Sequence, residues 1–305
     1  MGPTRAEPSR IAFLGFGLIA GSVARALRAR GAHPALVAWT PDGNGPRAGL
    51  ADGTLDAAPT SAAAALAGAE LVVLAAPPTG ILGLLADLAG PLRSALAERA
   101  TVTDVASTKT RILERADALG LPFVGGHPMA GRETSGFGAA TEDLFSGRPW
   151  VIVPGAAASA LDLDRATWLA TVVGADPIRM TAADHDRAVA AISHLPLVVA
   201  AALVEAVAGA AGGTDAGAPA PPEDWPIAAR LAASGWAGAT RLARGDPAMG
   251  AGILATNADE VAGRLRDLRR VLDGWIDALD RDAPDEAGLR DRLAGARDRL
   301  EDDTP

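Results

Sequence analysis

The chain has 305 residues, none of which is cysteine, and only one of its 28 basic residues is a lysine. Without cysteine, disulfides, thiolate nucleophiles and thiolate metal sites are excluded, and a reducing cytoplasm is the expected compartment. Histidine is scarce as well, and none of the four histidines stands in an HxxH or HExxH spacing. No metal site is therefore predicted.

No membrane-spanning segment is predicted from the sequence. A run such as residues 71–78 is far shorter than the roughly 20 residues that a membrane helix needs, and residues 1–10 lack the apolar region of a signal peptide. The formal net charge of −9 disfavours nucleic acid, which needs a concentrated basic face. We therefore expect neither a membrane nor a nucleic-acid partner, and a few local cations would hold an anionic small molecule.

The single lysine stands out in a chain that otherwise uses arginine. Because arginine is used at every other basic position, the lysine at position 109 indicates that this position requires a compact ammonium group and not a planar guanidinium. Chance survival of one lysine is the alternative.

The length and a hydrophobic content of 49% predict two domains. Helical segments separate strand-like apolar runs at residues 10–15, 35–40, 71–75, 101–104, 122–125 and 150–153. This alternation predicts an α/β domain with a Rossmann-type, doubly wound parallel sheet over residues 10–155, preceded by a tail of residues 1–9.

Residues 156–305 are predicted to form an all-α domain, with one further short strand at residues 177–180. Residues 182–210 indicate a long helix that is too apolar to be solvated on any side, so it belongs inside a helical domain or in a dimer interface. His185, between two aspartates near the start of this helix, is expected at the surface. A later stripe at three- and four-residue spacing predicts a core-facing helix and comprises Val261, Leu265, Leu268, Leu272, Trp275 and Leu279.

A glycine-rich fingerprint, G-x-G-x-x-A, lies at residues 15–20, directly after the first strand and at the start of a helix. This context predicts a dinucleotide site, because the glycines allow a tight turn and a close approach of pyrophosphate to the helix N-terminus. The predicted cofactor-binding residues are Gly15, Phe16, Gly17, Leu18, Ile19, Thr40, Arg47, Ala76 and Pro77.

The end of the second strand bears on the choice between NAD and NADP. An NAD enzyme normally offers an acid there to the ribose hydroxyls, whereas this chain has Trp39, Thr40 and Pro41. Thr40 and Arg47 could together receive a 2′-phosphate, which favours NADP. Arg47 on a solvated helix face is the alternative, so NAD stays open.

Residues 125–131, Gly-Gly-His-Pro-Met-Ala-Gly, place His127 in a predicted turn after the apolar run 121–124. Glycine lets the backbone approach a ligand closely, and Pro128 stiffens the exit. Beside a nucleotide site, this pattern predicts a catalytic histidine. A loop histidine that caps local structure is the alternative.

Three segments together, residues 103–109, 125–136 and 192–196, resemble the prephenate and arogenate dehydrogenases of tyrosine biosynthesis. The resemblance implies a helical second domain similar to the C-terminal domain of 6-phosphogluconate dehydrogenase, and a homodimer formed through it. It also implies NAD(P)-dependent oxidative decarboxylation of prephenate to 4-hydroxyphenylpyruvate. Arogenate is the alternative substrate, because Leu197 stands where prephenate-preferring members often carry a second histidine.

The resemblance also assigns site residues. It implies that His127 is the catalytic base, that Ser107 orients it, and that Arg241 binds a substrate carboxylate with its planar fork. Ser107 as a plain helix N-cap remains an alternative.

Three further residues are implied at the substrate site. Glu133 matches a carboxylate at the pocket rim, His194 lines the substrate site, and Lys109 helps to gather the anionic substrate. His194 as a satisfied core histidine is the alternative.

Two other functions compete with this interpretation. A β-hydroxyacid dehydrogenase usually needs a lysine in the long interdomain helix, and residues 182–210 contain none. A catalytically inactive NADP-binding sensor is disfavoured because His127, Ser107 and Arg241 are all present.

Overall fold

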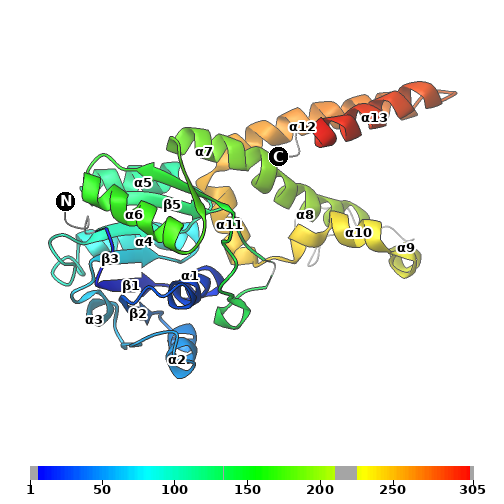
Figure 1. Cartoon of the computed structure of the whole chain (residues 1–305). Coiled ribbons are helices and arrows are strands. Elements are labelled where there is room, and N and C mark those ends of the chain that lie inside the picture. The colour runs from blue at the N-terminus through cyan, green and yellow to red at the C-terminus, as the bar shows by residue number, and fades with distance from the viewer. Residues whose placement is uncertain (1–5, 133, 210–224, 303–305) are drawn as a thin grey trace. The chain divides into compact units, whose positions relative to one another are not determined.

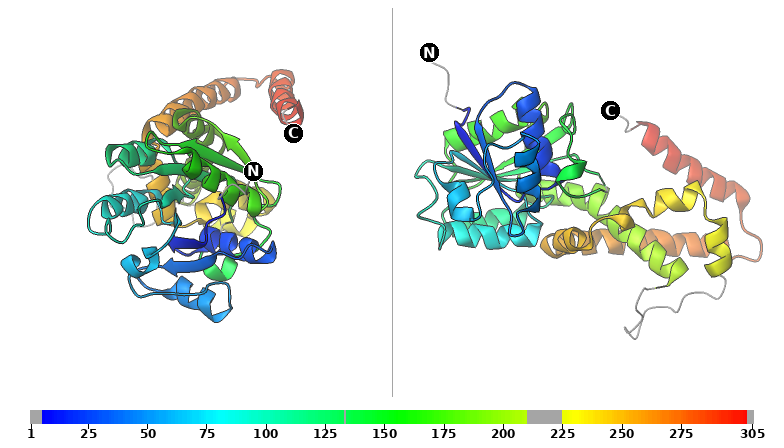
Figure 2. Two further views of the ribbon diagram at one scale, coloured as in Figure 1. Left: turned by 60° about the vertical axis from the view of Figure 1, so that its left-hand side comes forward. Right: turned by 90° about the horizontal axis from the view of Figure 1, so that it is seen from below.

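The computed structural model of the chain describes residues 6–132, 134–209 and 225–302. The chain forms two compact units, residues 1–258 and residues 259–305. A seven-stranded sheet with helices on both faces lies in the first unit (Figure 1, Figure 2).

The sheet has the strand order β2-β1-β3-β4-β5-β6-β7. Its strands are β1 (Arg10–Leu14), β2 (Ala35–Trp39), β3 (Leu71–Leu74), β4 (Thr101–Asp104), β5 (Phe123–Pro128), β6 (Pro149–Pro154) and β7 (Asp176–Arg179). Strands β1 to β5 are mutually parallel, and the order reverses between β1 and β3. The predicted Rossmann-type sheet is confirmed.

One pair departs from the all-parallel prediction, because β6 runs antiparallel to β5. A parallel partner would require a crossover connection, usually a helix. In the described part of the connection, the chain forms only the short turn η1 (Phe137–Ala139). Strand β7 pairs in parallel with β6, so the sheet continues past residue 155, where the sequence predicts a domain boundary.

The two faces of the sheet bury separate hydrophobic clusters. On one face, Leu27 of α1 (Leu18–Ala29) and Leu169 of α6 (Ala160–Val172) join Phe13 of β1. On the other, Leu85 of α4 (Pro78–Ala89) and Ile112 of α5 (Thr110–Ala118) are buried. The other helices before β7 are α2 (Asn44–Ala51) and α3 (Ala62–Leu66).

The remaining helices of the first unit follow β7. They are α7 (Ala182–Val189), the π turn η2 (Ala190–His194), α8 (Leu195–Ala208), α9 (Trp225–Leu231), α10 (Ser234–Ala239), the turn η3 (Arg241–Arg244) and α11 (Pro247–Thr256). α7 packs against α5, α8 against η3, and α11 against α4. These contacts tie the later part of the chain to the sheet domain.

α7, η2 and α8 form one continuous helix, Ala182–Ala208. In the described part of the chain, it is the one helix long and apolar enough to cross a membrane by length and composition alone. Its first turns carry buried polar side chains, as a helix of a folded domain does, whereas Ile192 is 69% exposed. The predicted long apolar helix is confirmed, and much of its apolar surface is not covered within the described chain.

The second unit consists of α12 (Ala258–Leu279) and α13 (Glu286–Asp302). The Arg292 guanidinium lies 3.9 Å from the centre of the Trp275 ring and donates hydrogen bonds to the carbonyls of Val271 and Gly274. The prediction that the stripe on α12 faces a core is wrong for Leu272 and Leu279, which are 50% and 56% exposed. Two helices enclose too little interior to bury such a stripe.

Candidate active site

The catalytic candidates gather at the carboxyl ends of β4 and β5. His127 lies near the end of β5, and Ser107 follows the end of β4 by three residues. Because β4 and β5 are parallel neighbours, these two segments leave the sheet at the same edge. Ligands of open α/β sheets bind outside this edge.

His127 heads a chain of hydrogen-bonded side chains. Its Nδ1 lies 2.8 Å from Nε2 of His185, and Nδ1 of His185 lies 2.8 Å from Oδ1 of Asp186. His127 is partly buried, whereas His185 is only 1% exposed and Asp186 3% exposed. The arrangement couples a histidine at the sheet edge to a buried carboxylate.

This geometry corrects two predictions. His185 is not a surface residue, because its ring is buried between His127 and Asp186. Residues 125–128 are not a turn but the end of β5, paired with β6. A Cβ at Gly126 would lie 2.6 Å from the Asp104 carbonyl oxygen, so glycine there allows close packing of β4 and β5.

Asp186 is held by the first turn of α5. Its Oδ1 accepts the backbone N–H of Lys109, and its Oδ2 accepts that of Thr110, both at 2.8 Å. The Asn257 amide, after α11, donates to the Asp186 carbonyl at 2.9 Å. Because Asp186 satisfies these amides and Lys109 is the N-cap residue of α5, the alternative that Ser107 caps this helix is wrong.

Lys109 is fully buried, and its ammonium contacts the equally buried carboxylate of Asp104. Asp104 also accepts the backbone N–H of Gly126 at 2.9 Å and of Ala106 at 3.1 Å. The prediction that Lys109 gathers substrate needs correction, because an ammonium enclosed in this pair does not face solvent. Lys109 instead joins the start of α5 to the end of β4, and Asp104 in turn binds β5 through Gly126.

The surroundings of His127 favour its neutral form. Burial lowers the pKa of His127 well below its usual value, and the nearby His185, Lys109 and His194 lower it further. Burial also acts to raise the pKa of Asp186, but hydrogen bonds from His185 and from the backbone of Thr110 and Lys109 outweigh it, so the net shift is downward. The site therefore combines a neutral imidazole with an ionised carboxylate.

His194 is a buried histidine of the helix, only 1% exposed. The Asn257 amide donates to its Nδ1 at 3.1 Å, and burial, foremost among several influences, lowers its pKa to about 4. Its Nε2 is buried without a hydrogen-bond partner among the described residues, so the ring is not the satisfied core histidine of the alternative, and this nitrogen stays available to a ligand.

Arg241 and Ser107 are the other predicted site residues within the described part of the chain. Arg241 is exposed at the start of η3, which packs against α8. Glu133 lies outside the described residues. Ser107 is partly exposed.

The nucleotide fingerprint lies where the strand order reverses, between β1 and β3. Gly15 has φ +98°, and a Cβ there would come within 2.2 Å of the Ala75 carbonyl oxygen, so only glycine fits. Gly17 is the N-cap residue of α1 and places no side chain over its first amides. Ala76 and Pro77 follow β3 on the other side of this reversal. The residues fit a dinucleotide, whose pyrophosphate would be held by α1.

The region after β2 is more crowded. The Thr40 hydroxyl donates to Asp42 at 2.8 Å and accepts the backbone N–H of Gly43 at 3.0 Å. Arg47 donates to the Asn44 side chain at 2.6 Å. A carboxylate and a guanidinium therefore both lie near the place where a ribose would bind.

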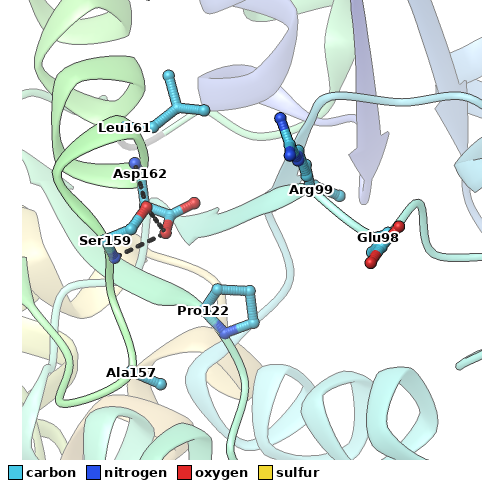
Figure 3. A pocket seen from close by; sticks show the side chains of 8 residues that line it. Glu98, Arg99, Pro122, Ala157, Ser159, Leu161 and Asp162 are labelled. Carbon is cyan, nitrogen blue, oxygen red and sulfur yellow. Dashed lines mark hydrogen bonds between the residues drawn. The ribbon is translucent and has the colours of Figure 1, made fainter.

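A cavity of about 350 Å³ lies at the opposite end of β4 and β5 (Figure 3). It is bordered by Glu98 and Arg99 before β4, Pro122 before β5, and the start of α6. There Asp162 forms a capping box with Ser159 and accepts the Thr101 hydroxyl at 2.6 Å. These polar groups serve the fold, and the cavity is not part of the candidate site.

Two family models match this chain. Residues 23–178 match the nucleotide-binding domain of prephenate dehydrogenase, and residues 181–293 match its dimerization domain. The chain is 31% identical over 275 residues to prephenate dehydrogenase of Bacillus subtilis, an alignment that covers 89% of this chain and 68% of that protein.

Solved structures show the same relationship. Synechocystis arogenate dehydrogenase is 33% identical, with a TM-score of 0.72 over 95% of this chain and 99% of that one. Prephenate dehydrogenase of A. aeolicus, in complex with hydroxyphenyl propionate and NAD+, is 25% identical, with a TM-score of 0.82 over 96% of this chain and 98% of that one. The chain therefore belongs to the prephenate dehydrogenase family and is an NAD(P)-dependent dehydrogenase.

Proposed function

We propose that this enzyme converts prephenate to 4-hydroxyphenylpyruvate by oxidative decarboxylation, with arogenate as the alternative substrate. The observation that carries the proposal is the partly buried His127, which is hydrogen-bonded to His185, which in turn is hydrogen-bonded to Asp186. His127 lies near the carboxyl end of β5, and the nucleotide fingerprint follows the carboxyl end of β1 in the same sheet. When bound, NAD(P) supplies the hydride acceptor.

In the proposed reaction, the hydrogen on the ring C4 leaves as hydride and the ring carboxylate leaves as carbon dioxide. His127 takes the proton of the C4 hydroxyl, which a neutral imidazole can do near pH 7. Ser107 orients the same hydroxyl. The electron pair of the broken bond to the carboxylate makes the ring aromatic. His127 then returns the proton to the C4 oxygen, and the product is released as the phenol.

The proposed function is tested by assaying both substrates with both cofactors and following the absorbance of the reduced nicotinamide. A higher kcat/KM for prephenate than for arogenate supports the main proposal. Turnover of arogenate alone supports the alternative, and Leu197 is the residue to examine in that case. Cofactor binding without turnover of either substrate would overturn both.

We further propose a preference for NADP. Thr40 and Arg47 can receive a 2′-phosphate, whereas the Asp42 carboxylate beside Thr40 repels it. The expected preference is therefore modest. A higher kcat/KM with NAD in the same assays would contradict it.

Arg241→Ala is expected to raise KM for the substrate by about tenfold or more and to change kcat little. A guanidinium that binds a carboxylate through two hydrogen bonds contributes to binding, whereas the base of the chemical step is retained. Arg244→Ala, an exposed arginine of the same turn η3, is the matched control. A collapse of kcat with unchanged KM would place Arg241 in the chemistry instead.

A homodimer formed through the helical half, in the cytoplasm, completes the proposal. The exposed apolar residues of η2 and α8, Ile192 and Val199, are 69% and 37% accessible, and a second copy would cover them. Light scattering at micromolar concentration should give twice the chain mass of 30.7 kDa. Ile192→Asp should shift that mass toward the monomer. A single-chain mass for the unaltered protein would contradict the dimer.

The pH dependence of kcat/KM is expected to hold its plateau through neutral pH and to fall only in acid. A base works unprotonated, and the pKa of His127 is lowered, so activity is lost as pH falls through that lowered value. The midpoint of the acid limb should lie below about 6.5, the ordinary value for histidine. A midpoint above neutrality would exclude a histidine in this environment as the base.

A further inference from the structure

We propose that His185 and Asp186 are positioning residues that fix the tautomer of His127, so that Nδ1 of His127 carries the proton and Nε2 is the basic atom. The inference rests on the proposed role of His127 as the base. It assigns a purpose to a buried pair that the sequence did not indicate.

The first step concerns what Asp186 can offer to His185. Its two oxygens already accept backbone N–H groups from Lys109 and Thr110, which can only donate. An ionised carboxylate has acceptors and no donor. Nδ1 of His185, 2.8 Å from Oδ1, must therefore be the protonated nitrogen of that ring.

The second step passes this assignment to His127. A neutral imidazole protonated on Nδ1 has a bare Nε2, so Nε2 of His185 accepts a hydrogen bond. The atom 2.8 Å away is Nδ1 of His127, which then donates its proton. The remaining nitrogen, Nε2 of His127, keeps its lone pair for the substrate.

The third step concerns rigidity. The amides of α5 hold the Asp186 side chain, the Asn257 amide holds its backbone carbonyl, and α7 carries His185 next to it. Three elements therefore fix the pair before substrate binds. When His127 gains a proton, the positive charge is shared with a ring that already faces a carboxylate, which stabilises the protonated base.

The experiment compares two replacements of one residue. Leucine at 185 removes the acceptor for Nδ1–H of His127, whereas glutamine restores one through its amide oxygen. We expect His185→Leu to lower kcat by about 10²- to 10³-fold with KM and cofactor affinity within about threefold. We expect His185→Gln to recover at least about tenfold of that loss.

A spectroscopic measurement reads the tautomer directly. With four histidines in the chain, nitrogen NMR of ¹⁵N-histidine-labelled enzyme can be assigned by replacing each in turn, and exposed His33→Leu is the control. In the unaltered enzyme, His127 and His185 should both carry the proton on Nδ1. In His185→Leu, His127 should lose that fixed tautomer, and in His185→Gln it should keep it.

The proposal is overturned if His127 carries its proton on Nε2 in the unaltered enzyme, or if His185→Leu leaves kcat within about threefold. A loss expressed in KM alone would also overturn it, because it would show a binding role. If His185→Leu does not fold, the spectrum of the unaltered enzyme and the glutamine variant still decide. If neither substrate is turned over, the proposed function fails, while the tautomer measurement judges this inference separately.

Discussion

Replacing His127 by glutamine is expected to lower kcat by about two to four orders of magnitude, the range typical of a lost general base. Glutamine retains a hydrogen-bond donor for His185 but cannot take a proton at neutral pH. Affinity for the cofactor should change little, because the fingerprint at Gly15 and Gly17 belongs to a different strand end. Steady-state kinetics and cofactor titration measure the two quantities.

His33→Gln serves as the control for this variant, because His33 is exposed and lies before β2. It should leave both quantities unchanged. If His127→Gln keeps its kcat, another group is the base and the proposed mechanism is wrong.

The second large effect is expected on stability. Lys109→Met should lower the free energy of unfolding by about 3–5 kcal/mol near pH 8, because it leaves the Asp104 carboxylate buried without its cation. Urea unfolding followed by circular dichroism measures the loss. Lys109→Met combined with Asp104→Asn removes both charges and keeps an acceptor for Gly126, so it should recover most of the stability.

The pH dependence of this loss gives a further check. Burial already raises the pKa of Asp104, and removal of the ammonium raises it further. A carboxyl whose folded pKa lies above its unfolded value stabilises the fold at low pH and loses that contribution as pH rises. The deficit of Lys109→Met relative to the unaltered protein should therefore shrink from about pH 8 to about pH 5. A deficit that is constant over this range would indicate lost packing instead of an unpaired charge.

The fold could be predicted from the sequence wherever local pattern decides structure. Apolar runs predicted the strands. The fingerprint at residues 15–20 predicted which end of the sheet binds the nucleotide, because a turn that has no room for side chains requires glycine, and glycine is visible in the sequence. The antiparallel β6 could not be predicted in this way, since strand direction depends on what the connection from β5 forms.

The site was harder to predict because its partners are distant in the chain. His185 stands among charged residues at a helix start, a pattern typical of a solvated surface. The neighbouring Asp186 accepts hydrogen bonds from backbone amides at the start of α5, 77 and 76 residues earlier in the sequence, and α7, which carries both residues, packs against α5. The arginine bias drew attention to Lys109, but composition could not reveal whether the ammonium faces a ligand or a buried carboxylate.

The π turn η2 between α7 and α8 has a consequence for how this helix can vary. A π turn holds one more residue than an α-helical turn, and each residue added to or removed from a regular α-helix rotates everything beyond it by about 100°. In the wider π turn, five residues span about the rotation that four span in an α-helix, so deleting one residue from Ala190–His194 should give an ordinary α-helical turn, with His185, Asp186 and the apolar surface of α8 kept in place. This turn is therefore the place in the helix where one residue can be gained or lost while α7 keeps its buried site residues and α8 keeps its facing direction.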